Sequence, residues 1–184
     1  MTARDQGAAA PSGAAAEIRV WDPLVRIVHW TVAGGCLLNL FFLESGEAHD
    51  VVGYAVTAAM AVRIVWGFVA PGHARFSDFV RGPREIRTYI SDNFRGRARR
   101  YLGHNPAAAV MMLALMALVL GVGVTGYMMG TDAYWGVKWV ESLHELLADG
   151  ILVLALLHAA AAIVESIRHE ENLVWSMVTG RKRP

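Results

Sequence analysis

The sequence predicts an all-α integral membrane protein, a four-helix bundle whose N- and C-termini both face the cytoplasm. Of its 184 residues, 55% are hydrophobic. A helix needs about twenty mostly apolar residues to cross the ~30 Å hydrocarbon layer of a bilayer. Four stretches meet this requirement, at residues 24–43, 51–70, 106–129 and 143–167. They predict four transmembrane helices in one domain, because the remaining segments are too short for a separate soluble domain.

Basic residues fall almost entirely on one side of this topology. Fifteen of the seventeen Lys and Arg residues lie before the first span or at its start, between the second and third spans, or after the fourth. With four spans these segments share one side, which the positive-inside rule makes the cytoplasmic side of the membrane. The arginine-rich segment between spans two and three is explained by this topology and by attraction to membrane lipid, so we expect no nucleic-acid partner.

Residues 1–17 are rich in alanine and lack the apolar core and small-residue cleavage site of a signal peptide, so they predict a disordered tail before the domain at 18–184. The first span places His29 just inside its cytoplasmic end. It also contains the only cysteine, Cys36, which we expect to pack as a small buried hydrophobe. With one cysteine, the chain can form neither an intrachain disulfide nor a C-x-x-C-H attachment to a cofactor.

The second span has ionisable residues near both ends. His49 precedes it at the outer face, and Arg63 follows fourteen residues later on the same helix face. An arginine inside hydrocarbon is costly and needs an explanation. Two interpretations are open: Arg63 is the charge partner of an anionic group buried at this depth, or it snorkels to the nearby cytoplasmic interface.

The third span begins at a predicted helix cap, with Asn105 as the N-cap and Pro106 in the first turn. Its later half contains Gly121, Gly123 and Gly126, which spell G-x-G-x-x-G. That motif binds dinucleotides only where it follows a strand and opens a helix, which is not the case here. We expect the glycines to allow close approach of a neighbouring helix or of a flat cofactor.

The fourth span carries His144 and His158, the most informative residues of the chain. Fourteen residues at about 1.5 Å and 100° each put both imidazoles on one helix face, roughly 21 Å apart. A histidine inside a membrane span is costly unless its ring has a partner, and metal ligation is a strong one.

Matched by depth, the histidines form two pairs, His49 with His144 near the outer face and His29 with His158 near the inner face. Two imidazoles per iron is a common arrangement in b-type cytochromes, and helix bundles bind haem through ligands on facing helices. The sequence therefore predicts two non-covalent, bis-histidine haems b in the bundle core. In this interpretation, the anionic partner of Arg63 is a propionate of the inner haem.

Three histidines fall outside this set. His73 and His169 lie in polar cytoplasmic segments, and we expect them to be solvated. His104 directly precedes the third span, where it either neighbours the inner haem or simply belongs to the start of the helix.

Five segments, spread over nearly the whole chain after the tail, are typical of one family: VWDPLVRIVHW, FSDFVRGPREI, YLGHNP, LHELLADGILVLALLHAAA and ENLVWSMVTGRKR. They resemble the bacterial di-haem b-type cytochromes, a family that includes the membrane subunit of nickel-iron hydrogenases. The resemblance implies that His29, His49, His144 and His158 hold two haems b. It also implies that the chain carries electrons between a redox partner and the membrane quinone pool of a respiratory chain.

One departure from this family concerns the connection between spans three and four. Residues 130–140 leave little outer surface on which a large hydrogenase subunit could dock. We therefore favour a stand-alone cytochrome or a small periplasmic partner such as a c-type cytochrome, with a dehydrogenase or hydrogenase subunit as the other candidate. The outer rim could steer a basic partner, because it is acidic: Glu44, Glu47, Asp50, Asp132, Glu141 and Glu145.

Other functions remain open on the sequence alone, although an electron-transfer protein is favoured over a stand-alone enzyme. One is a quinone-linked oxidoreductase that oxidises superoxide or reduces a metal chelate at a haem edge. Another is a histidine-lined transporter for protons or metal ions, although few other polar residues could line its path. A purely structural membrane anchor would not need histidines at matched depths.

Overall fold

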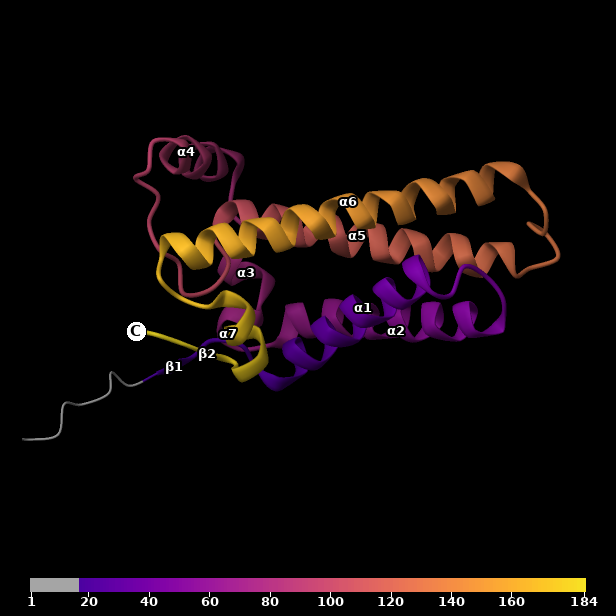
Figure 1. Ribbon diagram of the computed structural model, residues 1–184, viewed down its shortest axis with the longest axis horizontal. Coiled ribbons are helices and arrows are strands. Elements are labelled where there is room, and N and C mark those ends of the chain that lie inside the picture. The colour runs from indigo at the N-terminus through magenta and orange to yellow at the C-terminus, as the bar shows by residue number, and fades with distance from the viewer. Residues whose placement is uncertain (1–16) are drawn as a thin grey trace, which may run out of the picture.

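Four long helices lie side by side and give the molecule its length (Figure 1). They are α1 (Pro23–Phe41), α2 (Glu47–Val69), α5 (Pro106–Met129) and α6 (Lys138–Arg168). Each is long and apolar enough to cross a membrane. The computed structural model describes residues 17–184, so the predicted tail lies outside the described residues except for Glu17. The predicted all-α class is confirmed.

The helices differ from the predicted spans mainly where α2 and α6 begin. α2 starts at Glu47 instead of residue 51, and α6 starts at Lys138 instead of residue 143. Both extensions contain acidic residues, Glu47 and Asp50 in α2 and Glu141 in α6. Carboxylates are favoured there by the helix dipole. A search for apolar runs excludes such residues, which explains the difference.

Side-chain caps start α1 and α5. Asn105 caps α5 through its side-chain oxygen, and Pro106 is the first helical residue, as predicted. Asp22 caps α1 in the same way. The second carboxylate oxygen of Asp22 accepts a hydrogen bond of 3.1 Å from the indole N–H of Trp66 in α2. Asp22 therefore also ties α1 to α2.

α1 and α2 form one antiparallel pair, α5 and α6 form another, and α2 packs against α5. The glycines of α5 lie at these contacts. A Cβ at Gly123 would collide with the side chain of Thr57 in α2, and one at Gly121 would press on Leu147 in α6. Close helix packing therefore explains both glycines. The core contains Val56, Met60, Met116, Val119 and Ile151.

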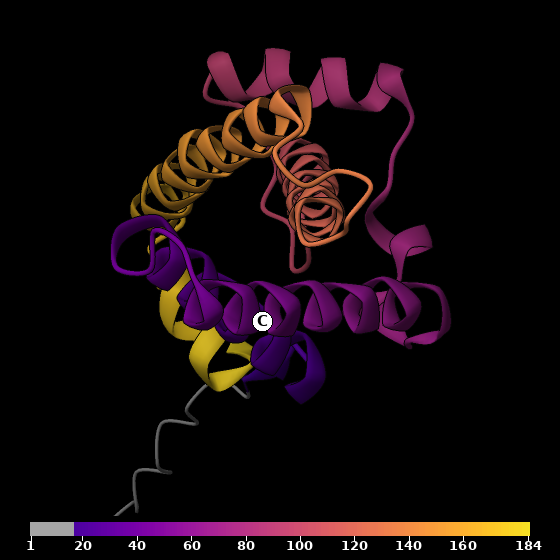
Figure 2. The same cartoon turned by 90° about the vertical axis from the view of Figure 1, so that its right-hand side faces the viewer.

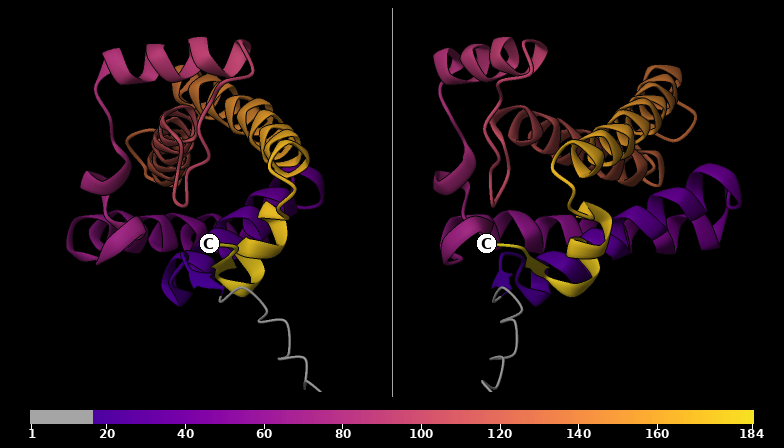
Figure 3. Two further views of the ribbon diagram at one scale, coloured as in Figure 1. Left: turned by 90° about the vertical axis from the view of Figure 1, so that its left-hand side faces the viewer. Right: turned by 60° about the vertical axis from the view of Figure 1, so that its left-hand side comes forward.

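The short elements gather at one end of the bundle, which we call the terminal end (Figure 1, Figure 3). Strand β1 (Ile18–Arg19) pairs there with the antiparallel strand β2 (Arg181–Lys182). The others are the 3-10 helix η1 (Gly72–Ala74) and helices α3 (Phe76–Phe79), α4 (Pro83–Phe94) and α7 (Leu173–Thr179). The opposite end, here the hairpin end, carries the α1–α2 and α5–α6 connections.

Gly180 lies between α7 and β2 and allows β2 to pair with β1. It ends α7 in a left-handed conformation with φ of 81° and donates its N–H to the carbonyl of Ser176 at 2.8 Å. A Cβ at this position would lie 2.7 Å from the carbonyl oxygen of Trp21. Only glycine combines this backbone angle with so close an approach.

Candidate functional site

The structure brings His49 and His144 together near the hairpin end. His49 lies in the first turn of α2 and His144 near the start of α6, and their ring centres are 6.2 Å apart. A metal ion held between two imidazole nitrogens, about 2 Å from each, places the ring centres roughly 6 Å apart. The observed spacing therefore fits an iron atom with two axial imidazoles.

His29 and His158 form a second pair of the same kind nearer the terminal end. They come from α1 and α6, which face each other, and their ring centres lie 6.4 Å apart. Each pair supplies two nitrogen donors, which is the number that a haem iron takes in addition to its four porphyrin nitrogens. Residues 17–184 contain no group of three or more His, Cys, Asp or Glu side chains suited to a bare metal ion.

Hydrogen bonds set the ring orientation of the hairpin-end pair. The Nδ1 atom of His49 lies 2.6 Å from the carbonyl oxygen of Leu43, which can only accept, so Nδ1–H is the donor. Thr125 Oγ1 lies 2.9 Å from Nδ1 of His144 and gives its own proton to the carbonyl of Gly121, so it accepts from this ring. Both rings therefore keep Nε2 free as a metal ligand, in the way that metal-bound histidines are usually held.

Arg63 is enclosed at the terminal end. Its side chain is only 4% exposed, and Nη2 donates to the carbonyl of Ala74 at 3.2 Å. The guanidinium carbon stands 5.5 Å from the centre of the Phe76 ring. Its Nη1 atom is buried without a hydrogen-bond partner among residues 17–184. The guanidinium therefore does not reach solvent, and it is held by the connection that follows α2.

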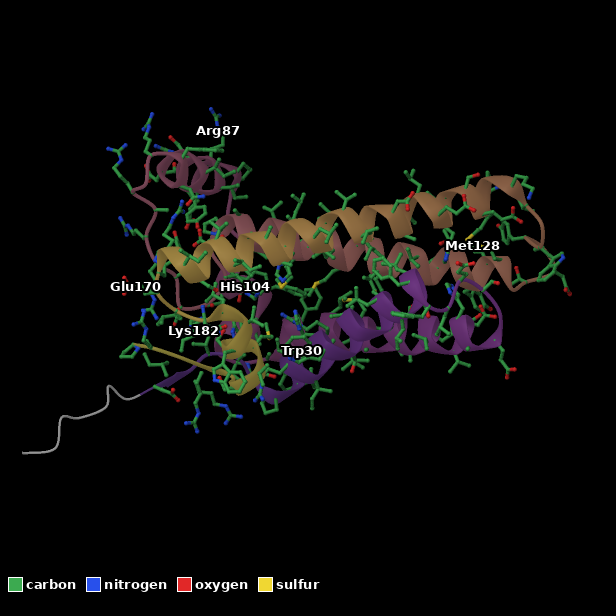
Figure 4. The ribbon with its side chains drawn as sticks, viewed as in Figure 1. Trp30, Arg87, His104, Met128, Glu170 and Lys182 are labelled. Atoms are coloured by element: carbon green, nitrogen blue, oxygen red, sulfur yellow. The ribbon has the colours of Figure 1, made fainter. Side chains whose placement is uncertain are left out.

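His104 also lies at the terminal end (Figure 4), close enough for the charge of Arg63 to act on its ring. We call the surroundings of these two side chains the terminal-end pocket. The ring centre of His104 lies 4.7 Å from that of Trp21 and 4.9 Å from that of Phe79. Burial, together with the charges of Arg63 and other nearby basic groups, lowers the pKa of His104 to about 3. The ring is therefore neutral at physiological pH. Its Nδ1 atom is also buried without a partner in the described chain.

These unpartnered nitrogen atoms test whether haem fits the terminal end. Buried polar groups are normally hydrogen-bonded, so Arg63 Nη1 calls for an acceptor and His104 Nδ1 for a hydrogen-bond partner. A haem carries two propionate carboxylates, which accept strong charge-assisted hydrogen bonds from a guanidinium. The chemistry of this pocket therefore fits the group that the paired histidines also fit.

The expectation that His73 and His169 are solvated holds in part: their side chains are 33% and 19% exposed, and each ring also contacts a carboxylate. His73 Nδ1 lies 2.8 Å from a carboxylate oxygen of Asp78, and His169 Nε2 lies 3.2 Å from one of Glu165. Each acidic partner is only four or five residues away in the sequence. Such local spacing is a signal from which these pairs could have been predicted.

Between the two histidine pairs the bundle core is apolar. Val56 and Met60 of α2 face Met116 and Val119 of α5 and Ile151 of α6 there. A path for protons or metal ions across a membrane needs polar groups to line it. The transporter interpretation therefore gains no support from this part of the chain.

A bundle of four helices long enough to cross a membrane, with histidines facing each other at two levels, is typical of membrane cytochromes of the b type. The chain belongs to the prokaryotic cytochrome b561 family, whose model matches residues 20–180. It is therefore a haem-binding, electron-transport membrane protein, and the resemblance noted in the sequence is confirmed.

The curated relatives are hydrogenase-associated cytochromes. The chain is 24% identical to the probable Ni/Fe-hydrogenase B-type cytochrome subunit of Bradyrhizobium diazoefficiens, over 90% of this chain and 86% of that protein. It is 26% identical to that of Rhodobacter capsulatus, over 90% and 81%. For Cupriavidus necator the identity is 27%, over 97% and 92%. No solved structure matches the chain.

Proposed function

We propose that this protein is a di-haem cytochrome b of the bacterial inner membrane that passes electrons between a redox partner at the outer face and the quinone pool. The observation that carries the proposal is the spacing of two histidine pairs, 6.2 Å and 6.4 Å, at two depths of one bundle. Haem iron supplies one-electron transfer between its ferric and ferrous states when bound. His49 and His144 would hold one haem, and His29 and His158 the other.

Helix α6 sets the distance between the two sites. His144 and His158 are fourteen residues apart on it, which corresponds to about 21 Å along the helix axis. The hydrocarbon layer is ~30 Å thick, so the two pairs would lie towards opposite faces of the membrane. That separation suits a path for electrons across the bilayer.

The terminal-end pocket supplies groups for the propionates of its haem. The Nη1 atom of Arg63 would donate a charge-assisted hydrogen bond, and the neutral ring of His104 would donate a second. Both side chains are held in place by protein contacts, to Ala74 and to the aromatic rings of Trp21 and Phe79.

The positive-inside rule assigns the terminal end to the cytoplasm, so the acidic hairpin end would face the periplasm. A small basic redox protein fits the charge of that end. The names of the relatives favour a hydrogenase subunit as the partner instead. Their alignments with this 184-residue chain extend over 214 to 229 positions, so the relatives contain segments that this chain lacks. We therefore retain both classes of partner.

The stoichiometry of haem tests the proposal directly. We expect the full chain, purified in detergent after production with ample haem, to contain two haems b per polypeptide and to be reduced by a quinol. A pyridine haemochrome assay and the reduced-minus-oxidised spectrum measure both properties. A colourless protein would contradict the proposal. A single haem per chain would contradict the proposed path of electrons across the membrane.

The hydroxyl of Thr125 offers a narrower test. We expect Thr125→Val to raise the midpoint potential of the hairpin-end haem alone, because His144 loses the acceptor of its Nδ1–H and becomes a weaker donor to ferric iron. A redox titration followed by absorbance should show one of two waves displaced. Thr57→Val is the matched control, since Thr57 bonds only to the Gly53 carbonyl of its own helix. Displacement of both waves, or of neither, would contradict the assigned role of Thr125.

A further inference from the structure

Helix α4 runs across the terminal ends of α5 and α6 instead of along them (Figure 2). Two contacts fix its rotation. Tyr89 is 6% exposed and meets Tyr101 edge-on with ring centres 5.7 Å apart. The side chain of Asn93, one turn later, accepts a hydrogen bond from Arg168 at the end of α6. The side of α4 that carries Tyr89 and Asn93 therefore faces the bundle, and the orientation of its other sides follows.

Two of those other sides are opposite in character. At about 100° per residue, Ile90 and Phe94 project about 100–140° from Tyr89, whereas Glu85 and Asp92 project about 300–320° from it. The apolar pair is 41% and 89% exposed. A helix that lies in a membrane surface has this arrangement, with apolar side chains towards the acyl chains and acidic ones towards water.

The remaining side, which faces away from the bundle, is basic. Arg84, Arg87 and Arg95 project about 160–240° from Tyr89. They are exposed and line an open groove of about 520 Å³, which Asp92 borders on the acidic side. Figure 4 shows Arg87 directed away from the bundle. Among residues 17–184, none of these three guanidinium groups takes part in an ion pair.

We propose that this groove binds the phosphate headgroups of anionic phospholipids in the leaflet at the terminal end. The basic side lies between the apolar and acidic sides, so it is level with the headgroups when Ile90 and Phe94 reach the acyl chains. Guanidinium groups bind phosphate through paired, charge-assisted hydrogen bonds. Arg84 and Arg95 are eleven residues, or about 16 Å, apart on the helix, which leaves room for more than one headgroup.

The exposed phenyl ring of Phe94 favours a lipid over other polyanions. Phe94 is 89% exposed and lies on the side of α4 next to the arginines. A nucleic acid or an acidic soluble protein bound to the arginines would leave this ring in water, whereas a membrane buries it. The proposal depends on the placement of α4 and does not require the haem ligands proposed above.

Native mass spectrometry of the detergent-purified haem protein tests the site. We expect wild-type protein to retain added phosphatidylglycerol in preference to phosphatidylcholine. At about 1 kcal/mol for each arginine near a lipid surface, the R84Q/R87Q/R95Q variant should bind phosphatidylglycerol roughly a hundredfold more weakly. The matched control R19Q/R97Q/R99Q removes the same charge from exposed arginines elsewhere at the terminal end, and should bind nearly as wild type does.

Haem content, measured on the same samples, shows whether each variant is folded. If the triple variant loses its haem spectrum, the three single variants replace it, each expected to bind about fivefold more weakly. Equal loss in the control variant would overturn the proposal, because it would show a general charge effect. Equal retention of phosphatidylcholine by wild type, or displacement of phosphatidylglycerol by an oligonucleotide, would also overturn it.

Discussion

The His158→Ala variant is expected to purify with one haem per chain instead of two, and to retain the haem at the hairpin end. His158 would supply one of the two axial nitrogens at the terminal end, and alanine leaves His29 as the only one. The hairpin-end pair lies about 21 Å further along α6, so its geometry should not change. A pyridine haemochrome assay with quantified protein gives the stoichiometry, and a redox titration should show a single wave.

Two further variants make this result specific. His169→Ala removes a histidine from the end of the same helix, where its ring is paired with Glu165, and both haems should remain. His49→Ala is the reciprocal change and should remove only the hairpin-end haem. Retention of two haems by His158→Ala would overturn the terminal-end pair. Loss of both haems from each single variant would show that the two sites do not bind independently.

The histidine pairs show how much of the site could be predicted from sequence. In a membrane bundle the helices are long and run roughly parallel, so the position of a residue along its span fixes its depth. Depth alone then limits which residues can meet. His49 and His144 fall at one level, and His29 and His158 at another, which is how the structure brings them together.

The terminal end could not be predicted in this way. His104 is buried because Trp21 and Phe79, both distant in the sequence, fold over it, and no periodic pattern encodes such contacts. Strands β1 and β2 have two residues each, too few for alternation to be visible. Helix α4, in contrast, has basic, apolar and acidic sides that follow from the helical spacing of its residues. Only the rotation of the helix, with Tyr89 towards the bundle, has to come from the structure.

Glu171→Ala is expected to lower the free energy of unfolding by about 2–3 kcal/mol, because it breaks a largely buried ion pair. The Glu171 carboxylate is 8% exposed and accepts hydrogen bonds of 3.0 Å from Arg100 and from the backbone N–H of Arg183. Its removal leaves Arg100 and the buried Lys182 without a countercharge. The Arg100 side chain is 30% exposed, so solvent screens part of its charge and the cost is below that of a fully buried pair.

The same carboxylate gives stability a pH dependence of defined sign. Burial alone would raise the pKa of Glu171, but the hydrogen bonds from Arg100 and Arg183 and the charge of Lys182 outweigh it, and the pKa is lowered. A carboxyl group with a depressed pKa in the folded state stabilises the fold above its ordinary pKa. That contribution is lost as the pH falls through the folded value. Wild-type protein should therefore lose stability on acidification more steeply than Glu171→Gln.

Labelling of the single cysteine measures the stability of these variants. Cys36 is half-buried in α1, so a thiol-reactive dye should label it fully only when the bundle opens, and the midpoint of thermal labelling reports unfolding. Glu85→Ala is the control, because Glu85 is paired with Arg81 at 3.8 Å on the exposed surface of α4 and should contribute less than about 1 kcal/mol. Equal midpoints for Glu171→Ala and wild type would contradict a structural role for the buried ion pair.

The part of the bundle that unfolds first in Glu171→Ala shows whether Glu171 stabilises the terminal end alone or the whole bundle. Lys182 lies 5.6 Å from the ring of Trp21, and Trp21 in turn packs on His104 in the wall of the terminal-end pocket. Loss of the countercharge should therefore loosen that wall before it affects the hairpin end. On heating, we expect the redox wave of the terminal-end haem to disappear first, and simultaneous loss of both waves would show that the bundle unfolds as one unit.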